Sequence, residues 1–345
     1  MKKLISKITR KKAPDQSPLR ITNDTVAQHR EKVLAGGRRF KYPVQYARHH
    51  LVRNAIIISV VAVILLLTFG WWRLYIVQDT STFIYRVTRV LPLPVAVVDG
   101  QDVAYSDYLM KYRSSIHYLE QKEQVNLNTD DGKRQADFIK EQAMQDSIAD
   151  AYAKKLAKDN KITVSDVELE TFLKQQRQSS DGEVSQQTYD AVIKDYYDWS
   201  PDEYRLTTSN KLLRQKVAYA IDSDASALKE NIANSIKQSS DLKSLTDKIS
   251  SVNGLKPTYG KSGWVPKSNQ DGGLSLAALE LKTGQVSDAI KSSTGDGYYF
   301  VKLVGLNDTQ INYEYIQVAL TKFDNNLEAI KKAGKINRYI SVSQE

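Results

Sequence analysis

Residues 55–72 spell AIIISVVAVILLLTFGWW and contain no charged side chain. The apolar character resumes after Arg73, so the run approaches the roughly 20 residues that an α-helix needs to cross a bilayer. A buried core helix is the alternative, but such a helix rarely lacks a polar face. Basic residues and histidines precede the run and two tryptophans end it, as membrane interfaces favour. We therefore predict a transmembrane helix over residues 54–78.

Residues 1–53 carry the positive charge of the chain. They hold 14 Lys and Arg residues against three acidic residues, whereas the whole chain has a net charge of +9, so the remainder is slightly acidic. Because basic flanks stay inside, we predict a cytoplasmic N-terminus, a single pass through the plasma membrane, and extracytoplasmic C-terminal domains. A cleaved signal peptide is disfavoured because its charged region is short and because no small-residue cleavage site follows the apolar run.

The same N-terminal tail, residues 1–53, shows no sustained apolar periodicity, and we predict that it is mostly disordered. It has two possible roles, attraction to anionic lipid of the inner leaflet or setting the topology alone, and both stay open. Nucleic-acid binding is not expected, because no basic face exists beyond the tail.

The composition excludes several kinds of chemistry. Cysteine is absent, which rules out disulfides, thiolate metal sites, a nucleophilic cysteine and a lipoprotein anchor. Of the four histidines only His117 lies beyond the span, and it is expected to pack or to lie on the surface. No P-loop, dinucleotide fingerprint or nucleophile elbow is present. Carboxylates such as Asp166, Glu168 and Glu170 are expected on solvated helix faces. We therefore expect no cofactor and no metal.

Beyond the span, residues 79–94 end in Leu-Pro-Leu-Pro and are predicted to be a juxtamembrane linker. Residues 95–221 are predicted to form a mostly helical domain, from apolar periodicity and capping motifs. Its expected elements are a strand at 95–98 with an Asp-Gly turn, a helix capped by Ser106, a long helix over 133–160, and helices starting at Ser165 and Ser200.

Residues 222–345 change character, because glycines punctuate short apolar segments. We predict a small α+β domain that is closed by a C-terminal helix. Its expected elements are a helix over 225–249, strands over 298–304 and 313–320, and a last helix near 325–340.

Three segments of the helical region resemble a known family. Residues 95–109 (VAVVDGQDVAYSDYL), 145–156 (QDSIADAYAKKL) and 162–168 (ITVSDVE) resemble the N-terminal chaperone domain of SurA/PrsA-type folding factors in order and spacing. The resemblance covers most of residues 95–221. It implies a protein that binds unfolded or extended exported polypeptides.

The C-terminal third is similar to a parvulin (PpiC-type) peptidyl-prolyl isomerase domain. Residues 241–250 resemble its second helix, residues 260–264 its glycine loop, and residues 281–287 with 297–303 its closing strands. Such domains speed rotation about X-Pro bonds, which is slow when uncatalysed. The predicted fold class is thus a single transmembrane helix followed by an all-α chaperone-like domain and a small α+β parvulin-like domain.

The usual pocket residues of that family are replaced here. Tyr299 stands where the last strand carries a histidine, Gln270 and Leu274 stand at the pocket methionine and phenylalanine, and Val252 lies near the acidic or cysteine position. The resemblance therefore predicts a pocket without its polar chemistry.

The family's first strand has no room between Ile221 and Ala225. Residues 313–320 could supply it through a circular permutation, which would place Tyr315 at the second histidine position. The resemblance then gives candidate catalytic residues, Tyr299 and Tyr315, and candidate substrate-binding residues, Trp264, Gln270, Leu274 and Leu279.

Three functions stay open at this point. A chaperone would hold clients on apolar and aromatic surface. An isomerase would need no nucleophile, only a pocket that favours the twisted amide, so Tyr299 and Tyr315 could replace the histidines. A scaffold for a membrane complex is the third. We favour the chaperone because a pocket with few oriented dipoles binds without accelerating rotation. Oligomeric state has no signature in the sequence.

Overall fold

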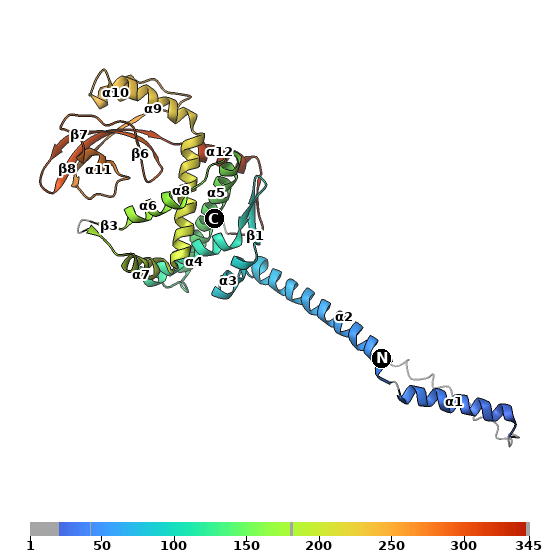
Figure 1. Ribbon diagram of the computed structural model, residues 1–345. Coiled ribbons are helices and arrows are strands. Elements are labelled where there is room, and N and C mark those ends of the chain that lie inside the picture. The colour runs from blue at the N-terminus through green and yellow to red at the C-terminus, as the bar shows by residue number, and fades with distance from the viewer. Residues whose placement is uncertain (1–20, 42, 180–181, 343–345) are drawn as a thin grey trace. The chain divides into compact units, whose positions relative to one another are not determined.

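The computed structural model describes residues 21–41, 43–179 and 182–342, and for 38–41 and 43–49 it describes the backbone alone. Two compact units, residues 1–72 and 73–345, make up the chain (Figure 1).

The first unit holds the helices α1 (Asn23–Lys41) and α2 (Pro43–Trp71). The backbone N–H of Thr22 donates to Thr25 Oγ1 at 2.9 Å where α1 begins, and Asp24 lies in its first turn. The prediction of a mostly disordered tail is therefore wrong for residues 23–41. Strong helix formers such as Ala, Gln, Glu, Lys and Arg stabilise this helix without an apolar stripe. Residues 1–20 lie outside the described residues.

The apolar helical segment His50–Ile76, which includes most of α2 and the short π-helix η1 (Trp72–Ile76), is long and apolar enough to cross a membrane. None of its most apolar stretch is buried by the described chain. Both findings are compatible with a span, while insertion and orientation stay predictions.

The second unit begins with a helical domain built around one core. Its elements are α3 (Thr82–Val90), β1 (Pro94–Val98), β2 (Gln101–Ala104), α4 (Tyr105–Gln121), α5 (Asp130–Asp159), α6 (Asp166–Gln176), β3 (Gln178–Ser179), β4 (Gly182–Glu183), α7 (Gln186–Tyr197) and α8 (Pro201–Ile221). Tyr105, Tyr108, Leu109 and Met144 are buried in this core. The mostly helical character predicted for this part of the chain is confirmed.

Local capping signals set several of these boundaries. The predicted capping boxes at Ser165 and Ser200 are both present, the second with Pro201 in the first turn. Ser106 is not a cap, because α4 starts at Tyr105 with Ala104 as its N-cap residue.

The predicted linker is wrong, because residues 82–90 form α3. Ser81 caps this helix by accepting a hydrogen bond from the Ile84 N–H, and Ile84 and Tyr85 are buried in the core of the helical domain. The prolines of Leu-Pro-Leu-Pro end the helix as predicted, but they follow a packed element.

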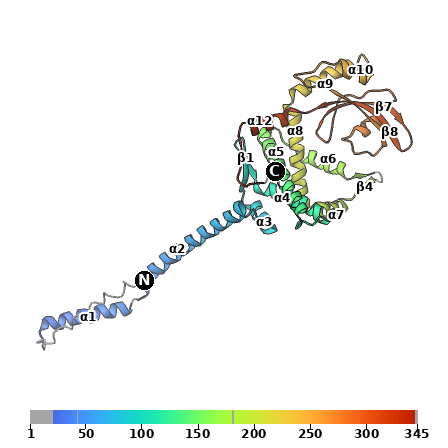
Figure 2. The ribbon, with the colours of Figure 1, turned by 180° about the vertical axis from the view of Figure 1, so that it is seen from behind.

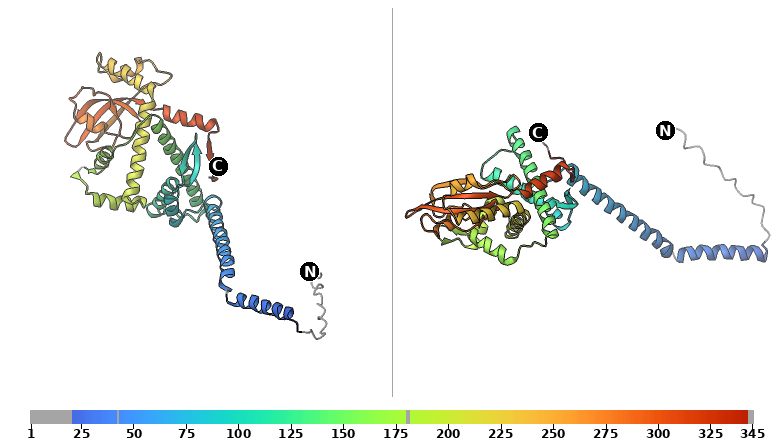
Figure 3. Two further views of the ribbon diagram at one scale, coloured as in Figure 1. Left: turned by 45° about the vertical axis from the view of Figure 1, so that its right-hand side comes forward. Right: turned by 90° about the horizontal axis from the view of Figure 1, so that it is seen from above.

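The chain returns to the helical domain at its C-terminal end. There it forms α12 (Lys322–Lys332) and β9 (Ile336–Arg338), and β9 pairs antiparallel with β1. Figures 2 and 3 show this last segment, in red, beside the early strands in cyan. Phe323 and Ile340 are buried in the first core, so the assignment of the last helix to the second domain is wrong. The predicted helix over 325–340 also ends early, at Lys332.

Residues 223–319 form a small strand-rich domain, here called the sheet domain. Its elements are α9 (Ser223–Ile236), α10 (Leu242–Lys248), β5 (Thr258–Pro266), α11 (Leu274–Leu279), β6 (Ile290–Lys291), β7 (Gly297–Leu306) and β8 (Gln310–Ala319). The four strands are antiparallel in the order β5-β8-β7-β6. In Figure 1, α9 and α10 lie on one side of this sheet and α11 on the other.

Three predictions for the sheet domain have clear outcomes. Pairing of residues 313–320 with residues 298–304 is confirmed, because β7 and β8 are neighbours. The single helix predicted over 225–249 is wrong, since α10 starts anew where Asp241 caps it. The predicted glycine loop at 260–264 is wrong as well, because these residues lie in strand β5.

Asp222 lies where the chain leaves the helical domain and where it returns. Its Oδ1 accepts the Ala225 N–H at the start of α9, and its Oδ2 accepts the N–H groups of Thr321 and Lys322 at 2.8 and 3.0 Å. One buried carboxylate thus holds together the two segments that connect the helical domain to the sheet domain.

Candidate functional site

The predicted catalytic tyrosines lie on the face of the sheet that α11 covers. Alternation along β7 and β8 places Tyr299, Tyr313 and Tyr315 on this face, together with Leu274 and Leu279 from α11. The ring centroid of Tyr315 is 5.6 Å from that of Tyr299 and 6.2 Å from that of Tyr313. These five residues are called the aromatic face below.

Two carboxylates bind the hydroxyl groups of the aromatic face. Tyr299 donates to Asp296 Oδ2 at 2.5 Å, and Tyr313 donates to Asp271 Oδ2 at 2.6 Å. Asp271 also accepts from the backbone N–H of Ser275 at 3.0 Å. Two acidic side chains therefore lie beside the predicted tyrosines. Sequence reasoning missed both aspartates: Asp271 is 42 positions from Tyr313, and Asp296, three positions before Tyr299, belongs to no recognised motif.

These contacts fix the charge state of the groups involved. Burial and the hydrogen bond to a carboxylate raise the pKa values of Tyr299 and Tyr313 well above the ordinary value, so both phenols are neutral. Desolvation raises the pKa of Asp271, but hydrogen bonds from Ser275 and Tyr313 lower it more, and the net shift is downward. The pKa of Asp296 is lowered in the same way by Thr294 and Tyr299.

The aromatic face is consequently poor at acid–base chemistry. Each of Tyr299 and Tyr313 already donates a hydrogen bond to a carboxylate, and Tyr315 contributes its ring. Such an arrangement leaves few free donors for a twisted amide, and Tyr299, Tyr313 and the α11 residue Leu274 are themselves buried.

A missing side chain on the neighbouring strand makes room for Tyr315. Gly260 is its cross-strand partner, and a Cβ at Gly260 would lie 2.4 Å from the Tyr315 ring. Glycine is therefore required here by close approach of the ring.

The other predicted pocket residues do not join the aromatic face. Trp264 pairs with Asn312, lies on the opposite face of the sheet against Gly305, and is 51% exposed. Gln270 is exposed, and Val252 packs against the core between the sheet and α9–α10. Of the predicted substrate-binding residues, only Leu274 and Leu279 lie beside Tyr299 and Tyr315.

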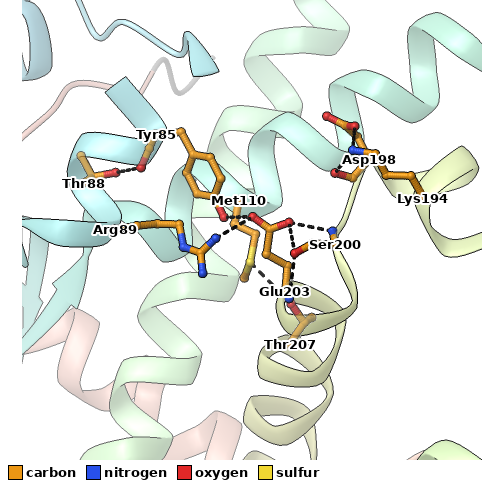
Figure 4. A network of polar contacts seen from close by, with 9 residues as sticks. All are labelled: Tyr85, Thr88, Arg89, Met110, Lys194, Asp198, Ser200, Glu203 and Thr207. Carbon is orange, nitrogen blue, oxygen red and sulfur yellow. Dashed lines mark hydrogen bonds and ion pairs between the residues drawn. The ribbon is translucent and has the colours of Figure 1, made fainter. Parts of the chain in front are cut away.

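A second candidate site lies in the helical domain, where α3, α4, α7 and α8 enclose a pocket of about 270 Å³. Figure 4 shows its central network, in which Tyr85 donates to Glu203 Oε1 and Arg89 pairs with the same oxygen at 3.4 Å. Glu203 Oε2 accepts from the backbone and hydroxyl of Ser200, each at 2.8 Å. Basic residues outnumber acidic ones in the lining, which includes Arg86, Arg89, Arg113 and Lys194.

Sequence reasoning found one half of this network and missed the other. The capping box Ser200–Glu203 is a local signal within four residues, and it was predicted. Tyr85 was missed because its helix was taken for a linker. Only the tertiary contact between residues 85 and 203 shows that the capping glutamate also holds α3.

Metal binding finds no support among the described residues, where no cluster of three or more His, Asp or Glu side chains could hold an ion.

One family model covers most of the helical domain. The model of the SurA-like N-terminal domain family matches residues 45–218. The foldase protein PrsA of Caldanaerobacter subterraneus subsp. tengcongensis is 24% identical over 238 residues, which cover 61% of this chain and 73% of that protein. Among solved structures, one from work on the SurA-like chaperones PEB4 and Cj1289 of Campylobacter jejuni aligns with 70% of this chain and 90% of its own, at 13% identity and a TM-score of 0.25.

Proposed function

The chain belongs to the SurA-like N-terminal domain family as a folding factor of the SurA/PrsA type, and from this premise we propose that it holds unfolded exported polypeptides beside a membrane. SurA- and PrsA-like proteins act outside the cytoplasm. The proposal adds that the segment His50–Ile76 anchors the chain and that its C-terminal domains face outward.

The observation that carries a holding function, rather than a catalytic one, is the state of the tyrosines. Neutral phenols that already donate to Asp271 and Asp296 leave few free donors on the aromatic face, and Tyr299 and Tyr313 are only 6% and 3% exposed. A client side chain would therefore meet the partly exposed Tyr315 and Leu279, which offer apolar contact but bind the planar and twisted amide about equally well.

Prolyl isomerisation is the second candidate, and one observation favours it. Strand β8 lies inside the sheet between β5 and β7, as the proposed circular permutation of a parvulin-like domain requires. Tyr315 then lies beside Tyr299 at the positions proposed for the two histidines. A parvulin-like domain that has lost its catalytic groups fits both the fold proposal and the holding function.

Apolar side chains on the helical domain extend the proposed client surface. Val192 on α7 and Leu206 on α8 are 45% and 43% exposed, so both can contact a bound polypeptide. Extended clients bury their own apolar side chains against such positions.

Suppression of aggregation by the full chain in detergent tests the proposal. We expect near-stoichiometric amounts to keep a chemically denatured client in solution. The double variant Val192→Lys/Leu206→Lys should need several-fold more protein, while Val304→Lys, equally exposed but in the sheet domain on the face opposite the tyrosines, should behave like wild type. Absence of suppression by the wild-type chain would overturn the proposal.

A further inference from the structure

Helix α3 carries two apolar faces. Ile84, Tyr85 and Thr88 are buried against the helical domain. Phe83 and Val90 are 72% and 81% exposed, and the partly exposed Val87 lies between them at helical spacing. A helix of a soluble domain normally presents a polar face to water, so the second apolar face indicates a partner.

This outward face is held firmly. Tyr85 donates to the buried Glu203, and Ser81 caps the helix. Arg113 donates to the Thr80 carbonyl at 2.7 Å and to Thr82 Oγ1 at 2.8 Å, which fixes the segment that leads into α3. The exposed apolar side chains therefore belong to an ordered helix.

The end of the apolar segment lies in the same core as α3. Leu74 is 4% exposed and packs in the core that buries Ile84 and Tyr85. The Tyr105 hydroxyl donates to the Leu74 carbonyl at 2.7 Å. Only residues 77–81 connect Ile76 to α3, and five residues span at most about 18 Å. If the segment crosses a bilayer, α3 must lie near its surface.

The charges around the exposed face suit a phospholipid surface. Arg86 and Arg89 flank Phe83 and Val90 on α3. Arg86 is exposed, and no ion pair of its guanidinium is formed among the described residues, whereas Arg89 reaches Glu203. Basic side chains beside an apolar stripe are typical of helices that lie in a membrane interface.

We propose that α3 is a second membrane contact, with its Phe83, Val87 and Val90 face in the boundary between headgroups and acyl chains and Arg86 against anionic headgroups. The inference rests on the proposed membrane span. A client polypeptide is the competing occupant, and the experiment below separates the two.

The chain has no cysteine, so single cysteines can be labelled with an environment-sensitive fluorophore in the full chain. The positions are Phe83→Cys and Val90→Cys on α3, Leu66→Cys in the apolar segment, and Leu276→Cys, which is exposed on α11. The proteins are reconstituted in vesicles of phosphatidylcholine and phosphatidylglycerol that contain brominated acyl chains. Quenching by bromine then reports contact with the acyl region.

We expect strong quenching at positions 66, 83 and 90 and none at position 276. Quenching at 66 alone would overturn the α3 contact while leaving the span intact. An unquenched label at 66 would overturn the span, and the α3 inference with it. A label at 83 or 90 that responds to added unfolded polypeptide but not to brominated lipid would assign the face to clients.

Lipid charge gives a second readout. Arg86→Gln should reduce quenching at position 90 in vesicles with phosphatidylglycerol and leave it unchanged in pure phosphatidylcholine. An equal reduction in both vesicles would overturn the preference of Arg86 for anionic headgroups.

Discussion

Asp222 shows how one residue can join the two domains of the second unit, residues 73–345. Its carboxylate is 1% exposed and accepts hydrogen bonds from three backbone N–H groups, at the start of α9 and at the approach to α12. Buried N–H groups that lose an acceptor keep their desolvation cost, so this position should be sensitive to substitution.

We predict that Asp222→Ala lowers the free energy of unfolding by about 1–3 kcal/mol, measured by urea titration in detergent. Asp202→Ala is the matched control, because Asp202 is an exposed acidic residue in the first turn of α8, and it should change stability by less than about 0.5 kcal/mol. Equal effects of the two substitutions would show that the hydrogen bonds of Asp222 do not stabilise the connection between the domains.

Asp271 gives a pH-dependent prediction. Because its folded-state pKa lies below the ordinary value of 3.8, its ionised form stabilises the fold above that pH. This contribution disappears as pH falls through the lower, folded-state pKa. Asp271→Asn should therefore cost about 1–2 kcal/mol at pH 7, and the difference from wild type should shrink below pH 4.

The control for Asp271 is Asp288→Asn, at an exposed aspartate of the same domain that forms no hydrogen bond among the described residues. Urea titrations of both variants from pH 7 to pH 3 provide the comparison. A difference for Asp271→Asn that stays constant with pH would contradict the role of its charge.

At the scale of elements, strands β5 and β8 pack closely because Gly260 leaves room for the ring of Tyr315. Gly260→Ala should cost about 1–3 kcal/mol, because the new methyl group overlaps the Tyr315 ring. In the background of Tyr315→Ala the same substitution should be nearly neutral. A double-mutant cycle by urea unfolding measures this coupling, and strictly additive effects would contradict the packing.

The sequence predicts elements well where the signal is local. The capping boxes at Ser165 and Ser200 close within four residues, so they can be recognised without the fold. Helix α3 was missed because the burial of Tyr85 depends on Glu203, which is 118 positions away. The last helix was placed in the wrong domain because β9 pairs with β1 at the other end of the unit.

The candidate site could be predicted from the sequence in part. Strand alternation places Tyr299 and Tyr315 on one face once β7 and β8 are known to pair. Trp264 would share that face, but a bulge between Lys261 and Gly263 shifts the register by one residue and turns its side chain to the other face. A bulge of this kind has no clear signature in a single sequence.

At the scale of the molecule, the C-terminal segment completes the helical domain. Ile340 is 3% exposed in the first core, so Ile340→Ala should cost about 2–4 kcal/mol. Hydrogen exchange should then show faster exchange in α4 and no change in β7. Faster exchange in β7 instead would show that the C-terminal segment belongs to the sheet domain.

Membrane topology is a separate prediction at this scale. The basic tail beside the uncharged run predicts that protease added outside intact cells digests the chain beyond about residue 80 and spares the tail. The fragments can be followed with antibodies against each end. If the C-terminal domains resisted the external protease, the orientation would be opposite to the one proposed.

The central claim is that this folding factor holds clients and does not accelerate prolyl isomerisation. Its most direct test is one refolding reaction limited by a proline isomerisation, in which aggregation and folding rate are followed together with increasing amounts of the full chain. We predict that aggregation falls to a plateau near equimolar chain while the slow rate constant stays unchanged, in wild type and in Tyr299→Phe alike. A many-fold faster slow phase at catalytic amounts, lost in Tyr299→Phe, would contradict the claim and make Tyr299 a catalytic residue.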